Sequence, residues 1–143
     1  MWSGSWGGPS PGDLSVARVL LVMPEAWPRA LLRAELRERG YDAQGAPTLA
    51  EAMVYPAEDP ERGPVRLVIV DGRVVGEGAR GVLDRLCERH SEARVLLLWG
   101  EESTPPPGPW AGVVRGPFSI AEMVRAVQWH IPAPAAPSGP WGR

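Results

Sequence analysis

Asp71 is the residue of this sequence whose type and position are best suited to chemistry. It follows the apolar run 65–70, so its carboxylate stands where a buried strand would end, and Gly72 marks a turn directly after it. The composition of the chain restricts what this carboxylate can do. All 15 basic residues are arginines, so a reaction that needs an ammonium point charge beside a phosphoryl group lacks its usual partner.

The other residues that could do chemistry form no catalytic or metal-binding set. His90 and His130 have no second ligand at metal-binding spacing, and both lie at predicted helix ends, where a positive charge would suit the helix dipole. Cys87, the single cysteine, falls on the apolar stripe of a predicted helix and is interpreted as a core residue. The sequence shows no Ser/His/Asp set, phosphate-binding loop or Cys/His zinc pattern, so we expect no enzyme and no cofactor.

Length and charge exclude several classes of protein. The 143 residues fit one domain, which we place at 15–131 between Gly/Pro/Ala-rich tails at 1–14 and 132–143 that are expected to be flexible. The net charge of -2 comes from scattered charges, without the basic stripe that nucleic acid or an anionic membrane needs. No apolar run approaches the ~20 residues of a membrane span, and no secretory signal is visible. We therefore expect a cytoplasmic protein, and the absence of lysine and asparagine suggests a GC-rich bacterial source.

Strand-like and helix-like patterns alternate along the chain, which predicts a parallel sheet covered by helices on both faces. The expected strands are 16–22, 41–45, 65–70, 95–99 and 112–115, and the expected helices are 28–40, 48–55, 79–90 and 119–131. The second and last helices each begin with a capping box, and 56–64 is expected to be a loop. Three consecutive prolines at 105–107 forbid a helix there, so the helix between the last two strands is expected to be missing or reduced to one turn.

The first helix also has a predicted orientation. Its apolar and small residues at 31, 32, 34 and 36 are expected to face the sheet, and Arg29, Arg33 and Arg37 to line the outside at i, i+4 spacing.

These units resemble the response-regulator receiver domain, the CheY-like family. The resemblance rests on the acid at the end of the third strand, on Gly40-Tyr41 at the end of the first helix and on the Gly-Pro-Phe-Ser at 116–119. It covers residues 16–131. It implies a flavodoxin-like three-layer α/β sandwich with a five-stranded parallel sheet of order 2-1-3-4-5, and a site at the carboxyl ends of strands 1, 3 and 4.

Of the residues that the resemblance would carry over, only Asp71 is present. In the family, two acids after the first strand help to hold Mg²⁺, an Asp after the third accepts phosphate, a Thr or Ser ends the fourth, and a Lys precedes Pro-Phe. The other positions here hold Met23, Pro24, Trp99 and Gly116. Glu25 lies one position after the acid pair, and Arg115 lies one position before the lysine position. They are displaced substitutes for these groups. Mg²⁺ prefers several oxygen ligands, so it is not expected, and Asp71 is expected to accept hydrogen bonds from its own turn.

Tryptophans are expected at the same end of the sheet. The indole of Trp99 takes the space of a small hydroxyl group and can donate one hydrogen bond but accept none. Trp27 and Trp110 are expected near the same rim. Either the three indoles cover the core in place of the missing helix, or they form an apolar platform for a peptide or small ligand.

The last helix supplies a candidate interaction surface. At 100° per residue, Trp129 falls opposite the apolar stripe, beside Glu122 and Arg125, and should be exposed. Single exposed apolar residues are common, but Trp and Arg are the usual anchors of binding hot spots. The resemblance implies partner contacts around the fifth strand and last helix, so Trp129, Arg125, Glu122 and Trp110 are the interaction candidates.

Together these observations predict a stand-alone, degenerate pseudo-receiver that acts without phosphorylation, as a protein–protein interaction module in bacterial signal transduction. Its expected partner is another signalling protein or, through the face of the fifth strand and last helix, a second copy of the chain. Two alternatives stay open. One is an atypical response regulator phosphorylated on Asp71, and the other is a small-ligand sensor that uses a Trp-lined pocket at the carboxyl ends of the strands.

Overall fold

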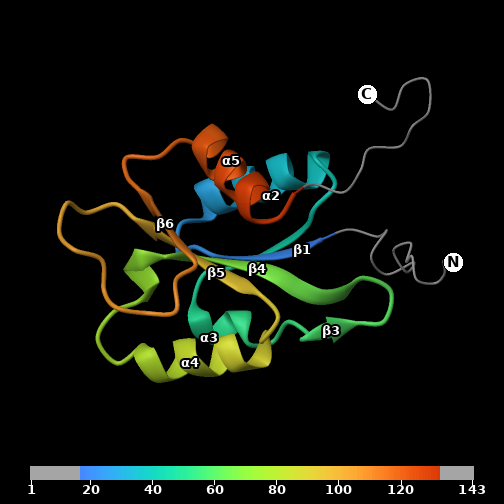
Figure 1. Cartoon of the computed structure of the whole chain (residues 1–143), viewed down its shortest axis with the longest axis horizontal. Coiled ribbons are helices and arrows are strands. Elements are labelled where there is room, and N and C mark those ends of the chain that lie inside the picture. Colours follow the sequence, from blue (N-terminus) through green and yellow to red (C-terminus); the bar gives the residue numbers. More distant parts are fainter. Residues whose placement is uncertain (1–16, 133–143) are drawn as a thin grey trace, which may run out of the picture.

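A computed structural model describes residues 17–132, which form three layers (Figure 1). Helices α2 (Ala26–Glu38) and α5 (Ile120–His130) cover one face of a parallel sheet, and α3 (Leu49–Ala52) and α4 (Arg80–Arg89) cover the other. The strands follow the order β2-β1-β4-β5-β6. Their bounds are Arg18–Val22 (β1), Asp42–Ala46 (β2), Gly63–Asp71 (β4), Arg94–Trp99 (β5) and Gly112–Arg115 (β6). The predicted α/β architecture is confirmed. The predicted order 2-1-3-4-5 is confirmed as well, because β4, β5 and β6 are the third, fourth and fifth of the expected strands.

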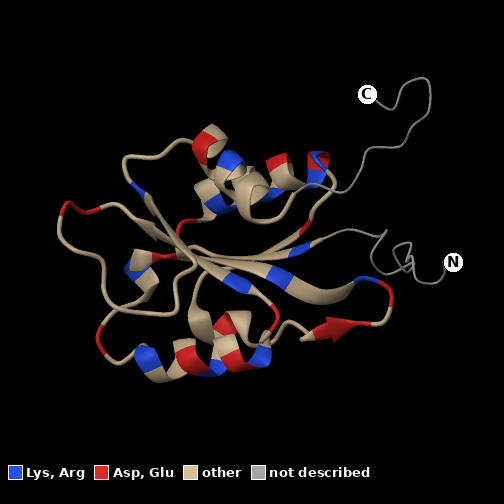
Figure 2. Ribbon diagram, viewed as in Figure 1, with Lys and Arg blue, Asp and Glu red and all other residues tan. Residues whose placement is uncertain are grey.

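The predicted tails, 1–14 and 132–143, lie outside the described residues except for Pro132. Within the described part of the chain, no helix is both long enough and apolar enough to cross a membrane. Basic and acidic residues occur together on α2, α4 and α5 rather than separated by sign (Figure 2).

Each face of the sheet has its own apolar cluster. Successive residues of β1 point to opposite faces, as the pleat of a strand requires, and all five are buried. On the side of α2 and α5 the strands contribute Val19, Leu21, Leu67, Ile69, Leu96 and Leu98. On the side of α3 and α4 they contribute Leu20, Val22, Val68, Val70 and Val95. Burial on both faces explains why these strands are near-continuous apolar runs in the sequence.

The helix ends follow the predicted capping signals. Ser119 Oγ accepts a hydrogen bond from Glu122 N at 3.1 Å, and Glu122 Oε1 accepts one from Ser119 N at 2.8 Å, so both halves of the α5 capping box form. Thr48 Oγ1 accepts from Glu51 N at the start of α3. Gly40, just beyond α2, has φ of 95°, the left-handed conformation in which glycine ends a helix.

Some local predictions were wrong. Helix α2 begins at Ala26, two residues early, and α3 ends at Ala52 instead of near 55. Ala34 is exposed, because Leu32 and Leu36 alone fill the space between α2 and the sheet. The predicted loop 56–64 contains a short strand, β3 (Glu58–Asp59), which pairs antiparallel with the first two residues of β4.

The described residues 100–111, between β5 and β6, contain no helix, as predicted. Trp110 takes part of the missing helix's place. Its indole packs against the cluster on the α3 and α4 side, and its Nε1 donates a hydrogen bond to Pro106 O at 2.8 Å. Val113 on β6 is left 37% exposed.

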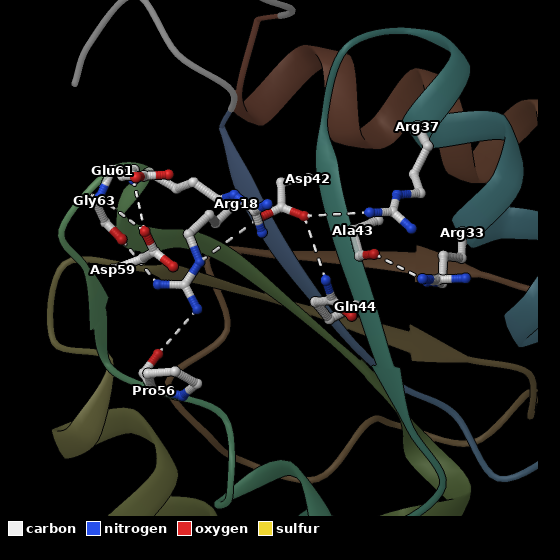
Figure 3. A network of polar contacts seen from close by, with 11 residues as sticks. Arg18, Arg33, Arg37, Asp42, Ala43, Gln44, Pro56, Asp59, Glu61 and Gly63 are labelled. Atoms are coloured by element: carbon white, nitrogen blue, oxygen red, sulfur yellow. Dashed lines mark hydrogen bonds and ion pairs between the residues drawn. The ribbon is translucent and has the colours of Figure 1, made fainter. Parts of the chain in front are cut away.

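The arginines of α2 reach toward β2 instead of simply lining the outside of the helix. Arg29 Nη1 donates to Met23 O at 2.6 Å, and Arg33 Nε donates to Ala43 O at 3.1 Å. Arg37 Nη2 lies 3.8 Å from Asp42 Oδ1 (Figure 3). Arg33 and Arg37 therefore fasten α2 to the edge strand β2, and Arg29 fastens it to the residue that follows β1.

A buried charged network lies at the amino end of β1 and β2, opposite the end that carries Asp71. Arg18 donates to Gly63 O at 2.8 Å and to Pro56 O at 2.9 Å, and its Nε lies 3.9 Å from Asp42 (Figure 3). Asp42 also pairs with Arg62 at 3.3 Å. Because buried charges are tolerated only when they are paired, this network fixes the segment 56–63 against the sheet.

Candidate functional site

Asp71 is the last residue of β4 and lies opposite Leu98 of β5. Its side chain is 7% exposed. The chain turns directly after it into a short 3-10 helix, Gly72–Val74, and Asp71 Oδ1 caps this turn by accepting a hydrogen bond from Arg73 N at 2.9 Å. The expectation that Asp71 binds a backbone amide of its own turn is therefore confirmed.

Arg73 also covers the Asp71 carboxylate with its side chain. Its Nε donates to Oδ1 at 3.2 Å and its Nη2 to Oδ2 at 2.8 Å, the two-point geometry that a guanidinium makes with a carboxylate. Hydrogen bonds to Asp71, and next to Glu25, hold the pKa of Arg73 above its ordinary value. Both oxygens of Asp71 are thus engaged by one arginine.

Glu25 joins this pair from the loop after β1. Its Oε2 lies 3.2 Å from Arg73 Nη1, so Arg73 bridges Asp71 at the end of β4 and Glu25 in the loop after β1. The sequence suggested that Glu25 could replace the missing acids beside Asp71. Glu25 does come close to the site, but its carboxylate binds the arginine.

The two positions after β1 offer no carboxylate. The Met23 side chain is buried in the apolar cluster under α2 and α5, and Pro24 is half-buried. Among the described residues, no group of three His, Cys, Asp or Glu side chains could hold a metal ion. The donor set around Asp71 therefore does not fit Mg²⁺, which needs several oxygen ligands.

Trp99 lies over the turn that follows Asp71. A Cβ atom built on Gly72 would stand 2.5 Å from Trp99 Cε3, closer than any real contact, so only glycine fits beneath the indole. Trp99 Nε1 donates to Ser103 O at 2.8 Å, which fixes the ring in this position. The indole thus occupies the place where the receiver pattern has a small hydroxyl side chain.

The position of the family's lysine is closed in a similar way. A Cβ on Gly116 would lie 2.9 Å from Gly100 Cα and 3.2 Å from the ring of Phe118. Arg115 was the suggested substitute, but it is exposed and its Nη1 lies 3.5 Å from Ser103 O. The cation that contacts Asp71 is Arg73 instead.

A hollow of about 280 Å³ remains between Asp71, Trp99 and Phe118. Its lining consists of Asp71, Gly72, Arg73, Leu98, Trp99, Gly100, Glu101 and Phe118. Neither Trp27, which is 74% exposed, nor Trp110, which packs on the α4 side, lines it. The three indoles therefore do not line one common hollow.

Three of the four interaction candidates lie on α5 and are exposed as predicted, and the fourth, Trp110, is not. Trp129 is 82% exposed, and Glu122 and Arg125 are exposed on the same helix. The Glu122 carboxylate is occupied by the capping box. Trp110 is the exception, because it is half-buried in the cluster on the opposite face of the sheet.

No family model matches the sequence, and no curated protein matches it. Solved structures do match the fold. Chemotaxis protein CheY4 of Vibrio cholerae has a TM-score of 0.64 at 17% identity over 82% of this chain and 100% of that chain. A CheY-like receiver domain protein of Methanospirillum hungatei has a TM-score of 0.64 at 13% identity over 80% and 93%. The chain has the receiver-domain fold.

A third similar structure carries a phosphorylated aspartate. A response regulator of Burkholderia pseudomallei, solved with a phosphorylated aspartic acid, a calcium ion and citrate, matches this receiver-like domain with a TM-score of 0.62. The identity is 19% over 78% of this chain and 66% of that one. Identities this low establish the fold alone, so the function of this receiver-like domain has to be argued from its own residues.

Sequence reasoning missed Arg73 as the partner of Asp71. The signal was present, because a basic residue two positions after an aspartate in an Asp-Gly turn can fold back onto that aspartate. The receiver pattern has its lysine at position 116, so Arg115 was expected to supply the positive charge instead.

Proposed function

We propose that this receiver-like domain works in signal transduction by binding another protein, without accepting phosphate on Asp71. The observation that carries the proposal is the two-point contact of Arg73 with the Asp71 carboxylate. A phosphoryl group can be transferred only to a free carboxylate oxygen. Here each oxygen already accepts a hydrogen bond from Arg73, so the guanidinium would have to release the oxygen that takes the phosphoryl group.

The missing metal ligands support the same proposal. Transfer to a carboxylate brings negative charges together, and a divalent cation normally offsets them. Met23 and Pro24 supply no side-chain oxygen, and the Gly116 position has no room for a lysine. The Arg73 guanidinium places a positive charge against Asp71, which is part of the electrostatic task of Mg²⁺ and lysine in the family pattern.

The partner surface in this proposal is the outer face of α5. An exposed indole next to an arginine is the composition of binding hot spots, and Trp129 and Arg125 lie on the same exposed face of that helix. The test is a pull-down from the source organism with wild-type protein and with Trp129→Ala. Trp27→Ala is the matched control, because that indole is 74% exposed at the start of α2. Equal capture by wild type and Trp129→Ala would remove Trp129 from the surface.

Beryllofluoride tests the absence of a phosphorylated state. Trp99 lies against the Asp71–Gly72 turn, so its fluorescence should report a phosphoryl mimic bound at Asp71. We expect no saturable change on addition of Mg²⁺ and beryllofluoride. A change that saturates in wild type and disappears in Asp71→Asn would favour the atypical response regulator instead.

The hollow beside Trp99 supports a second candidate, a small-ligand sensor. Its volume of about 280 Å³ is near the lower end of the range for small-molecule sites, about 300–1,000 Å³. Aromatic rings line one part of it and the Asp71–Arg73 pair another. A screen of small molecules by thermal shift tests this function. A hit counts only if Phe118→Ala or Trp99→Phe abolishes the shift.

A further inference from the structure

The connection between β5 and β6 lacks the helix that usually links two parallel strands, and prolines set its backbone instead (Figure 1). Within the stretch 104–109, here called the proline segment, positions 105, 106, 107 and 109 are prolines. A proline fixes its own φ at about −65° and pushes the residue before it to a ψ of about 120–160°. Pro105 and Pro106 meet both conditions, which favours the backbone of a polyproline II helix. Residues 104–107 accordingly form no α-helix, strand or turn.

The burial of these residues follows the period of a polyproline II helix. Such a helix has three residues per turn, so residues three positions apart share one ridge. Thr104 and Pro107 are both exposed, whereas Pro105 and Pro106 between them are half-buried. One ridge of the helix therefore faces solvent, and the other two are partly covered by the protein.

Two tryptophans hold the proline segment in place. Trp99 Nε1 donates a hydrogen bond to Ser103 O at 2.8 Å, directly before the segment, and Trp110 Nε1 donates to Pro106 O at 2.8 Å. The Trp110 indole also lies against Gly108, where an added Cβ would stand 2.5 Å from Cε2. The segment is thus ordered before any partner arrives, which lowers the entropy cost of binding.

Two backbone carbonyls of the segment are left for a partner. A polyproline II helix has no internal backbone hydrogen bonds, so its C=O groups must be satisfied from outside. Pro107 O accepts from Arg80 Nη1 at 3.3 Å, but Thr104 O and Pro105 O have no hydrogen-bond partner within residues 17–132. The indole or phenol group of another protein can donate to such carbonyls.

We infer that the proline segment is a docking ligand for a protein whose aromatic-lined groove binds a polyproline II helix. Grooves of this kind recognise a helix that is already formed, and they receive its proline rings between aromatic side chains. Pro107 and Pro109 are the exposed rings that enter the groove. Donors along the groove bind Thr104 O and Pro105 O, the two carbonyls that the chain itself does not use.

This inference goes beyond the proposed function by adding a second binding surface. It rests on the proposed function only in taking another protein as the partner, and it depends neither on the state of Asp71 nor on Trp129. The surface comes from the prolines that replace a helix in this chain. If the inference fails, binding through Trp129 is still tested by the pull-down.

The test is calorimetric titration of the full chain with purified SH3, WW and EVH1 domains, which bind polyproline II helices through aromatic-lined grooves. The stretch 132–140 contains four further prolines. Pro134, Pro137 and Pro140 are therefore replaced by alanine in every protein tested, and this variant is the parent. We expect saturable binding of the parent to at least one domain, and its displacement by that domain's own proline-rich peptide.

Substitutions in the parent locate the contact. Pro107→Ala should weaken binding by about tenfold or more, because it removes an exposed ring of the segment. Pro109→Ala, at the other exposed ring, should weaken it as well. Pro60→Ala, at an exposed proline directly after β3, is the matched control and should bind like the parent. Trp129→Ala should also bind like the parent, because α5 is not part of this surface.

Urea denaturation establishes that each variant is as stable as the parent. Three results would each overturn the inference: no saturable binding to any of the three domain types, binding that the proline-rich peptide does not displace, or equal affinity of the parent, Pro107→Ala and Pro109→Ala. Loss of binding in Trp129→Ala would assign the contact to α5 and overturn it too.

Discussion

Arg73 Nη2 lies 2.8 Å from Asp71 Oδ2, and Arg73 Nε lies 3.2 Å from Oδ1, so one guanidinium spans the carboxylate at the end of β4. The same group reaches Glu25 from the loop after β1. The end of the sheet where the receiver pattern would gather a metal ion, a phosphate and a lysine is thus held together by an internal ion pair. The pairing is local in sequence, since the arginine follows the acid by two residues.

Replacing Arg73 tests the structural role of this ion pair. Arg73→Gln removes the charge and leaves the carboxylate of Asp71, a side chain that is 7% exposed, with fewer donors. Because the arginine is itself half-exposed to solvent, we expect a modest loss of about 1 kcal/mol in the free energy of unfolding. Urea denaturation measures it. Arg125→Gln, at an exposed arginine of α5, is the control and should change stability by less than about 0.5 kcal/mol.

Gly72→Ala tests the contact between the Asp71 turn and Trp99. The added Cβ would stand 2.5 Å from the indole, so the ring must move, and overpacking of this kind costs about 1–3 kcal/mol. Gly76→Ala is the matched control, since a Cβ there meets nothing within 4 Å, and it should be neutral or slightly stabilising. In a Trp99→Ala background the Gly72→Ala cost should largely vanish. An equal cost in both backgrounds would show that the indole is not the obstacle.

His90 predicts a loss of stability in mild acid. It is 3% exposed, and neither ring nitrogen has a hydrogen-bond partner among the described residues. Burial, and then the charges of Arg89 and Arg18, lower its pKa from the ordinary 6.5. The expectation that a charged imidazole would suit this helix end was therefore wrong. As pH falls below 6.5 the unfolded chain takes up a proton that the folded chain does not bind, so the free energy of unfolding decreases until pH reaches the lowered pKa.

The variant His90→Phe isolates this effect. Denaturation in urea at about pH 7.5 and about pH 5.5 should show a smaller loss of stability in the variant than in wild type. The two proteins should differ by a constant amount above pH 7, where His90 is neutral in both the folded and the unfolded state. An identical decrease in wild type and variant would assign the acid sensitivity to other groups.

Cys87 is predicted to react slowly with thiol reagents. It packs against the cluster on the α4 side, and burial first, then Asp84, raises the pKa of its thiol. Since the thiolate is the nucleophile, a raised pKa and restricted access both slow the reaction. Ellman's reagent at pH 8 should modify the folded protein at least tenfold more slowly than glutathione, and denaturant should remove the difference. A rate equal to that of glutathione would contradict the core interpretation.

Patterns with a fixed period predicted most of the fold. The apolar runs of β1, β4 and β5 identify strands buried on both faces, and the 100° periodicity of α5 places Trp129 on the exposed side. The triple proline correctly predicted the missing helix. Each of these predictions depends on backbone geometry that a local sequence determines.

The contacts of long side chains could not be predicted in this way. Arg33 and Arg29 each extend from α2 to a carbonyl fixed by another element, and Arg73 reaches Glu25 on a distant loop, so these partners depend on how the elements pack. The same holds for the indoles. Trp110, which precedes β6, packs into the cluster on the α4 side. Trp27, which comes after β1, stays exposed to solvent.

The mass of the intact protein after treatment with Mg²⁺ and acetyl phosphate tests the central claim most directly. Arg73 covers both oxygens of Asp71, and the positions around it supply neither a metal-binding acid nor a lysine. The account predicts an unchanged mass for wild type, the same as for Asp71→Asn treated in parallel. A stoichiometric increase by one phosphoryl group in wild type, lost in Asp71→Asn, would contradict it and show that Arg73 yields its place to phosphate.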